Sequence, residues 1–458
     1  MVRKISEKEL KHRSRRLSIK EGILASASSA FGNSYISPFA IAINASNSAV
    51  ALLSSISGLL GPLAQTVSSR LIEKHSRKKI ILKAVLFEAL IWIPLITIAF
   101  LFYKGILVSF LPFFLLFFFA LFTIAAYSVG PAWFSWLGDI TDTKFRGRWF
   151  SKRNILTGFS SVTLALLASV FLSYFKKQGW TMFGFIVLFA LAFTFRMMSR
   201  HTFKQQYEPK IKLKKGYYFS FWDFLKKSNK TNFGKFSLFR AFLAFASSIS
   251  APLLAVYLLR YLEFNYIIYM VVILAGSVFS ISVLRLWGNF ADKYGNYKVL
   301  AITSLLIPII PILWILSPSP IYMVLIPSLV SGISWAGFNL SSSNFIYDNV
   351  QDQKRGLAVS YYNLLIGIGV FLGAGLGAIL IKYLTISFTT PLFFIFFLGG
   401  LMRMVVVFIW IPKIKEIRKT ERLDGKKALK NLVFKQLKPS LSEEVHEIMS
   451  IKKYLRDK

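Results

Sequence analysis

A short charged pattern occurs twice in this chain, each time near the end of a hydrophobic stretch. The pattern is Asp-x6-Arg-Gly, and it occupies Asp139–Gly147 and Asp348–Gly356. The acid and the base can each pair with an opposite charge or with the terminus of a neighbouring helix. Both elements of the pattern are shifted by the same distance along the chain, which indicates that one unit of the sequence has been duplicated.

Two connections between hydrophobic stretches repeat in a similar way. The first runs from Ser69 to Lys79 and the second from Gly288 to Lys298. Each has an acid at its fifth position, a small residue at its first and eighth positions, and basic residues after them. Small residues allow the flanking helices to approach closely, and the acid can meet a basic group or a helix amino terminus. We expect these segments to form tight, charged hinges.

Other kinds of site chemistry are poorly represented. The chain has no cysteine, which excludes disulfides, thiolate metal sites and thiol catalysis. Its four histidines, which lie in tails or polar connections, are His12, His75, His201 and His446. We therefore expect no metal site, no cofactor and no catalytic residues, and we do not expect an enzyme.

The composition is that of a membrane protein. Hydrophobic residues make up 55% of the 458 residues and charged residues only 17%, and the mean hydropathy is +0.56. A soluble domain could not cover that much apolar surface. Apolar stretches of about 20 residues, long enough to cross a bilayer as a helix, occur about twelve times. The predicted fold class is an all-α polytopic membrane protein.

The net charge of +36 is unevenly distributed along the chain. Basic residues gather in both tails and in every second connection, whereas the alternate connections carry only Lys104, Lys176, Lys177, Arg260 and Lys382. By the positive-inside rule, both termini and the central loop are cytoplasmic. The basic residues then face the anionic headgroups of the lipid bilayer. No nucleic-acid partner is expected, because no folded soluble module is present to bind one.

The expected organisation is two six-helix bundles joined by a basic linker. The parts are a basic cytoplasmic tail (1–20), an N-terminal six-helix bundle (21–199), a basic cytoplasmic linker with an interfacial helix (200–235), a C-terminal six-helix bundle (236–412) and a second basic cytoplasmic tail (413–458). The interfacial helix is inferred from aromatic residues at 217–222 that precede Lys226 and Lys227.

Helix-bending and close-packing residues add to the pattern of duplication. Pro38 in the first span recurs as Pro252 in the seventh, and proline can kink a membrane helix. Gly369, Gly373 and Gly377 lie on one face of the eleventh span, where such a ladder permits close helix contact.

These features resemble the major facilitator superfamily (MFS) of transporters, over essentially all twelve spans. The family's cytoplasmic signature is G-x-x-x-D-x-x-G-[RK]-[RK]. The second loop keeps its glycines and its aspartate, whereas the first loop replaces them by serines and a glutamate but keeps the two basic residues. The matching positions are Gly288, Asp292 and Gly295 in one loop and Ser69, Glu73, Ser76, Arg77 and Lys78 in the other.

The resemblance implies a cytoplasmic latch, because in that family these loop charges form networks that hold the outward-open state. The latch residues are Glu73, Arg77, Asp139 and Arg146 in one half and Asp292, Asp348 and Arg355 in the other. The associated loop glycines are Gly147, Gly288, Gly295 and Gly356. The alternative interpretation is that these charges only anchor the turns and set the topology.

The resemblance also implies that the first, fourth, seventh and tenth helices line a substrate path. The polar and aromatic candidates in those spans are Asn33, Tyr35, Tyr127, Trp133, Ser247, Ser248, Trp335 and Asn339. Aromatic rings can stack on a sugar or an apolar solute, and amides and hydroxyls can orient it. Each of these residues could instead serve ordinary helix packing or interhelical hydrogen bonding.

Glu88 is the one acid well inside an apolar span. A charge at the bilayer centre costs about 2.5–3.5 kcal/mol on insertion scales, so an intramembrane acid is a functional candidate. One interpretation is that Glu88 couples transport to protons. The other is a protonated carboxyl group that is hydrogen-bonded to a neighbouring helix.

We expect a secondary transporter of the cell membrane, a monomer that moves a small neutral or lipophilic solute by alternating access between its halves. One alternative is proton-coupled drug efflux, which is weakened because the fifth span lacks the G-x3-G-P element common in such antiporters. Another is uptake of a sugar or metabolite. A non-transport alternative is a membrane scaffold or receptor built on the same fold.

Overall fold

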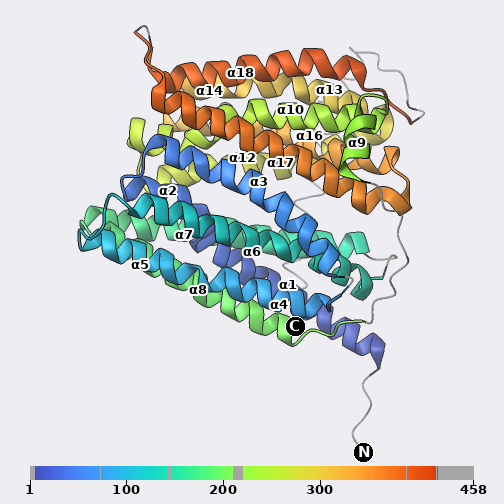
Figure 1. The fold of residues 1–458 in the computed structure, drawn as a ribbon, viewed down its shortest axis with the longest axis horizontal. Coiled ribbons are helices and arrows are strands. Elements are labelled where there is room, and N and C mark those ends of the chain that lie inside the picture. Colours follow the sequence, from blue (N-terminus) through green and yellow to red (C-terminus); the bar gives the residue numbers. More distant parts are fainter. Residues whose placement is uncertain are drawn as a thin grey trace, which may run out of the picture. The chain divides into compact units, whose positions relative to one another are not determined.

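The computed structural model describes residues 6–72, 74–142, 146–209, 220–387, 389–418 and 420. At 146–148 and 352–356 the description is of the backbone alone. Within these ranges the chain forms helices and no strand (Figure 1).

The first half contains long helices joined by short connections. They are α1 (Glu7–Phe31), η1 (Asn33–Tyr35), α2 (Ile36–Ala42), α3 (Asn47–Leu71), α4 (Arg77–Leu90), α5 (Trp92–Tyr103), α6 (Leu111–Ile140), α7 (Arg146–Lys177) and α8 (Thr181–Lys204). The helices α4 and α5 follow each other directly and make one span.

The second half has more interrupted helices. After α9 (Phe221–Ser228) come α10 (Asn232–Ser250), η2 (Ala251–Leu253), α11 (Leu254–Val256), the π-helical η3 (Tyr257–Tyr261), α12 (Tyr266–Tyr294), α13 (Asn296–Leu306), η4 (Ile307–Ile309), α14 (Ile310–Ile315), α15 (Pro320–Leu325), α16 (Pro327–Asn349), α17 (Asp352–Tyr383), α18 (Pro391–Trp410) and η5 (Ile411–Lys413).

Eleven spans in the described part of the chain are long and apolar enough to cross a membrane. The remaining predicted span, at 21–44, corresponds to the end of α1 with η1 and α2. It falls outside the eleven because Gly32 ends α1 and the amino-terminal part of α1 is strongly charged. The twelve-helix membrane fold is thus confirmed, and the first and seventh spans are both interrupted near their prolines, at η1 and η2.

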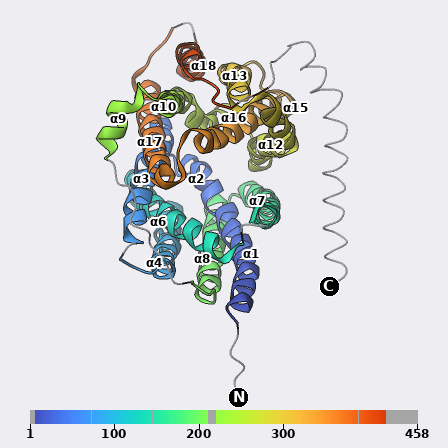
Figure 2. The ribbon, with the colours of Figure 1, turned by 90° about the vertical axis from the view of Figure 1, so that its right-hand side faces the viewer.

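Contacts between helices group the chain into two compact units. The first comprises 1–216, 244–271 and 360–395, and the second comprises 217–243, 272–359 and 396–458. In the first unit α3 and α4 both pack against α6, and α8 packs against α1, α4 and α5. Figure 2 shows these helices nearly end-on, with α1 next to α7 and α8. In the second unit α13 packs against α16.

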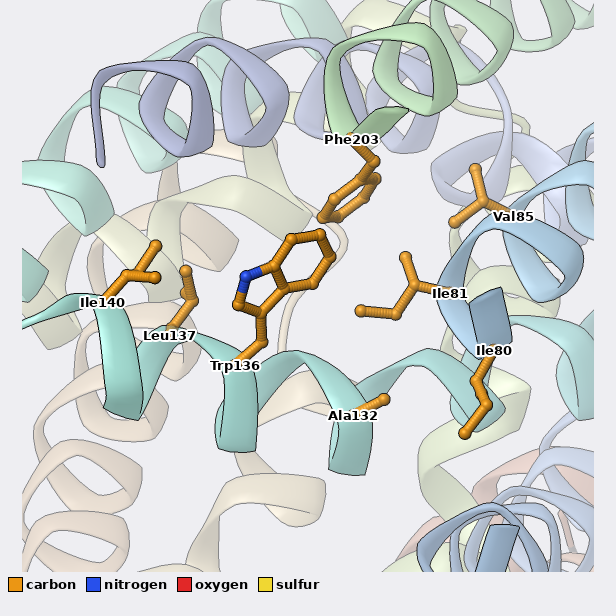
Figure 3. Close-up of a cluster of buried hydrophobic side chains, with 8 residues drawn as sticks. All are labelled: Ile80, Ile81, Val85, Ala132, Trp136, Leu137, Ile140 and Phe203. Atoms are coloured by element: carbon orange, nitrogen blue, oxygen red, sulfur yellow. The ribbon is translucent and has the colours of Figure 1, made fainter. Parts of the chain in front are cut away.

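Each unit has a buried hydrophobic cluster that contains a tryptophan. In the first, Trp136 of α6 lies between α4 and α8 and contacts Phe203, with a distance of 6.2 Å between ring centroids (Figure 3). Its indole N–H donates to the carbonyl oxygen of Tyr207 at 2.9 Å. In the second, Trp287 of α12 packs near Phe290 and donates to the carbonyl oxygen of Ile333 at 2.9 Å. Each of these two indole N–H groups thus donates to a backbone carbonyl oxygen, and buried polar groups in proteins generally have such a partner.

The linker and the tail are described in part. Residues 210–219 and 421–458 lie outside the described residues, and with them most of the carboxyl tail expected from 413 onward. The described part of the linker contains the short helix α9, capped by Ser220, whose side chain accepts from the amide of Asp223 at 3.1 Å. Trp222 is 67% exposed, whereas Phe224 on the other face is buried against Phe233.

The glycines of α17 place that helix directly against backbone. A Cβ atom added at Gly373 would lie 2.1 Å from the carbonyl oxygen of Phe245 in α10, and one at Gly377 would lie 2.2 Å from that of Ile249. The ladder therefore serves helix packing. On another side of α17, a Cβ at Gly367 would lie 2.3 Å from the carbonyl oxygen of Gly58 in α3.

We expect Gly373→Ala to destabilise the protein and Gly375→Ala to leave its stability nearly unchanged. The first methyl group would overlap a carbonyl oxygen that belongs to a helix backbone, and overpacking of this kind costs about 1–3 kcal/mol. The second would meet nothing nearer than the Ser55 hydroxyl at 3.7 Å. Thermal unfolding of both variants in the same detergent measures the difference, and equal melting temperatures would contradict the packing described for α17.

Candidate functional site

Arg77 is the centre of a polar cluster at the start of α4. Its side chain is fully buried and pairs with Asp139 of α6 at 2.6 Å. The guanidinium also donates to the Ser135 hydroxyl at 3.0 Å and to the carbonyl oxygen of Pro209 at 2.8 Å. Glu208 lies 3.6 Å from its Nε atom. The structure thus joins two of the predicted latch residues and adds Glu208, which was not predicted.

The second repeat builds the same contact from different groups. Asn296, at the position in its loop that Arg77 has in the first, donates to Asp348 of α16 at 2.8 Å. Asn344 in turn donates to the amide oxygen of Asn296 at 3.3 Å. The pairing of loop and helix end is therefore duplicated along with the sequence. An ion pair in the first repeat corresponds to an amide–carboxylate hydrogen bond in the second.

The two loops also begin their helices differently. In the first, the Ser76 hydroxyl accepts from the amide of Lys79 at 3.1 Å and so caps α4. In the second, Gly295 precedes α13 with a φ of 96°, a conformation that favours glycine. The serine that departs from the family signature thus serves as an N-cap, and the glycine that keeps it serves a left-handed turn.

The other predicted loop residues are less completely described. Glu73 lies outside the described residues, and Arg146, Gly147, Arg355 and Gly356 belong to α7 and α17 by their backbone alone. Asp292 is exposed near the end of α12, and Gly288 lies in the same helix.

A cavity of about 260 Å³ lies inside the first bundle. It brings together three predicted residues from different helices: Asn33 of η1, Glu88 of α4 and Tyr127 of α6. Hydroxyl groups from α1, α3 and α6 and the rings of Trp92, Phe119 and Phe122 complete most of the lining. The arrangement offers hydrogen bonds beside flat apolar surface, which is the common make-up of small-molecule sites.

Glu88 belongs to a buried charged chain that crosses four helices. Its carboxylate pairs with Arg196 of α8 at 2.5 Å. Arg196 also donates to the Ser199 hydroxyl at 3.3 Å, and that hydroxyl donates to Glu21 of α1 at 3.1 Å. Glu21 pairs with Arg153 of α7 at 3.3 Å. Arg196 is only 7% exposed, and it neutralises the acid beside the cavity.

The remaining candidates for the substrate path occupy packed positions. Tyr35 is fully buried, and its hydroxyl donates to the carbonyl oxygen of Ala165 at 2.6 Å. The ring of Trp133 lies 4.7 Å from the Arg153 guanidinium carbon. Ser247 and Ser248 are each 9% exposed in α10.

In the second unit, Trp335 packs edge-on against Phe338 at 5.5 Å. Asn339, one turn along α16, is exposed, and its carbonyl oxygen accepts from the Ser343 hydroxyl at 3.0 Å. These two residues are not brought to the cavity of the first bundle, whose lining comes from α1 and the helices that follow it up to α6.

Segments from both halves of the chain meet within the first unit. The guanidinium of Arg260, in the π-helical turn of the seventh span, donates to the Asn47 amide oxygen and, at 2.9 Å, to the carbonyl oxygen of Ala45. Farther along α3, the Ser55 hydroxyl donates to the carbonyl oxygen of Phe371 in α17 at 2.8 Å. Both contacts join the first half to the second.

Comparisons with known proteins agree on the fold. Residues 236–441 match the sequence model of the Major Facilitator Superfamily. No curated protein sequence matches the chain. The solved structure of the nucleoside transporter NupG is similar with a TM-score of 0.63 and 14% identity, covering 88% of this chain and 98% of that one.

Two further structures are similar to the same extent. A bacterial homologue of the iron transporter ferroportin, in an inward-facing state, has a TM-score of 0.65 and 15% identity and covers 87% of this chain and 99% of its own. An auto-inhibited POT family peptide transporter has a TM-score of 0.66 and 11% identity, and the match covers 90% of this chain and 99% of that one. At these identities the likeness concerns the fold.

We expect Asp139→Asn to destabilise the protein more than Asp348→Asn. The first change removes the charge facing a fully buried guanidinium, and hydrogen bonds to charged groups contribute about 1.5–3 kcal/mol. The second leaves an amide facing the amide of Asn296, where a neutral hydrogen bond contributes about 0.5–1.5 kcal/mol. Melting temperatures of the two variants, compared with the wild type, measure both effects. Equal losses would contradict the unequal roles of the two repeats.

Proposed function

Because residues 236–441 match the sequence model of the Major Facilitator Superfamily and the fold is similar to that of solved transporters, we propose that this chain belongs to that superfamily and moves a small neutral solute by alternating access. It is a multi-pass membrane transporter, and its cavity is the observation that supports the proposal. We place it in the cell membrane with both termini in the cytoplasm, as the distribution of basic residues favours.

The neutral character of the solute follows from the electrostatics of the cavity. Of the described residues that line the cavity, Glu88 alone is charged, and Arg196 neutralises it at 2.5 Å. A charged solute would therefore find no uncompensated partner there. A neutral solute with hydroxyl or amide groups could bond to Asn33 and Tyr127 while an aromatic face meets Trp92 or Phe122.

The size of the cavity points to a small solute. Its volume of about 260 Å³ is just under the range of about 300–1,000 Å³ usual for ligand pockets. Among the transporters with this fold, NupG carries nucleosides. A nucleoside combines a flat aromatic ring with sugar hydroxyls and no charge, and this chemistry suits the lining. Sugars and other neutral metabolites of similar size fit the same description.

Alternating access is supported by the contacts that join the two halves inside the first unit. Arg260 and Ser55 form polar contacts across the halves, and α17 packs closely against α3 at Gly58 and Gly367. Such contacts must separate when the halves open at that end. The pairs formed by Arg77 and Asp139, and by Asn296 and Asp348, are the groups we propose as the latch of the opposite state.

We expect the purified protein to be stabilised by neutral aromatic or hydroxylated solutes in a thermal-shift screen, because a ligand stabilises the state that it binds. A solute identified in this way should enter proteoliposomes containing the protein. Tyr127→Ala should weaken its binding by about tenfold, the effect of losing roughly 1.4 kcal/mol of contact energy.

Tyr174→Ala is the matched control, because this exposed tyrosine of α7 does not line the cavity. It should leave both binding and flux unchanged. The proposal is wrong if only charged solutes bind, or if the two tyrosine variants lose affinity equally. A protein that binds solutes but never moves them would favour the scaffold or receptor alternative.

Proton coupling is the second candidate mechanism, since Glu88 lines the cavity. The carboxyl group of Glu88 is held in an ion pair by Arg196 at 2.5 Å. We therefore expect Glu88→Gln to lower the melting temperature but to leave the ratio of fluxes with and without a pH gradient unchanged. Glu88→Gln combined with Arg196→Gln should recover part of the lost stability, because breaking one side of a buried pair is worse than removing both. Loss of the gradient dependence in Glu88→Gln would establish coupling instead.

A further inference from the structure

A second cavity, of about 300 Å³, lies in the first unit where α3 ends and α4 begins. Leu71 of α3 and Ile80 and Ala84 of α4 give it apolar walls. Both helices pack against α6, whose Ser128 also lines the cavity. It is separate from the cavity that contains Glu88, because the two cavities share no lining residue, although Ser128 follows Tyr127 of the other cavity directly in α6.

Among the described residues that line this cavity, three are basic and none is acidic. His75, Lys79 and Lys83 are all exposed and all line it. Lys79 and Lys83 are four residues apart and so lie on the same face of α4, one turn from each other. The other basic residues that begin α4 are held by the protein: Arg77 by Asp139, and Lys78 by the carbonyl oxygen of Gln206 at 2.7 Å. The fold uses two of these cations and leaves the other two facing the cavity.

The exposed surface changes from basic to apolar along both helices away from the loop. On α4, Lys79 and Lys83 are followed after one more turn by Phe87, which is 62% exposed. On α3, Leu71 is preceded at the same spacing by Val67, 61% exposed, and Leu63, 40% exposed. In a membrane-spanning helix such exposed apolar stripes face lipid tails, and the basic residues then lie at the level of the headgroups.

We propose that this cavity is a binding site for one anionic phospholipid. Its phosphate would lie between Lys79 and Lys83, with His75 at the rim, and an acyl chain would follow the apolar walls toward Val67 and Phe87. A soluble phosphate would satisfy the cations but not the apolar walls, and a zwitterionic lipid would bring its own cation to the lysines. The combination of charge and apolar surface therefore selects a lipid with a net negative headgroup.

The site can be tested by native mass spectrometry of the full chain in detergent micelles, titrated with phosphatidylglycerol. The wild type should retain one lipid at concentrations where further binding is absent. Lys79→Ala combined with Lys83→Ala should weaken that binding by roughly thirtyfold, as expected for the loss of two basic contacts with an anionic headgroup. Phosphatidylcholine should bind the wild type no better than it binds this variant.

Lys226→Ala combined with Lys227→Ala is the matched control, because it removes the same charge from the short helix α9. It should keep the tight lipid. A second variant, Ala84→Phe, fills the cavity while both lysines remain, and it should also lose the lipid. The melting temperatures of Ala84→Phe and of the Lys79→Ala, Lys83→Ala variant show whether each is still folded. Lys79→Arg combined with Lys83→Arg keeps both positive charges and should retain binding.

Two results would overturn the proposal. One is equal loss of phosphatidylglycerol in the two double-lysine variants, which would indicate attraction by net charge alone. The other is displacement of the lipid by inorganic phosphate at millimolar concentration together with unchanged binding in Ala84→Phe, which would indicate a site for a free anion.

Discussion

The first bundle depends on a single constraint: a guanidinium removed from water must find an acid. Arg77, Arg153 and Arg196 are all buried, and each is paired with a carboxylate on another helix. An unpaired buried charge costs several kcal/mol, so these pairs fix which helices are neighbours and at what height. The cavity proposed for the solute lies beside one of these pairs. The charge of Glu88 in the cavity lining is neutralised by the same ion pair with Arg196 that joins α4 to α8.

The fold was predictable from the sequence to a large extent, because both spans and topology are properties of local composition. Spans of sufficient apolar length recur, and the duplicated loops give their order. The prolines at 38 and 252 correctly indicated where the first and seventh spans are interrupted. Glycine spacing in the eleventh span indicated close packing, and the structure places Gly373 and Gly377 against the backbone of α10.

The candidate site was less predictable, because side-chain partners depend on helix rotation. Glu88 was recognisable as an intramembrane acid, but its partner Arg196 lies more than a hundred residues away along the chain. Glu21 and Arg153 stand near the ends of spans, where charges are ordinary, so no signal separated them from loop residues. The resemblance places Tyr35 and Trp133 in spans that line a substrate path. In the structure, however, the hydroxyl of Tyr35 bonds to the carbonyl oxygen of Ala165, and the ring of Trp133 packs against Arg153.

The contacts of α17 have a consequence for how the halves can move. Gly373 and Gly377 hold this helix against the backbone of α10, which belongs to the same half of the chain, whereas Gly367 brings it against Gly58 of α3 in the other half. At the contact between the halves, side chains fill the space above the glycines: Val370 lies over Gly58, and Pro62 lies over Gly367. Opening the halves at this end must therefore separate packed apolar surface as well as the polar bonds of Arg260 and Ser55. The backbone contact between α17 and α10 lies within one half, so these two helices are expected to stay together and to move as one body.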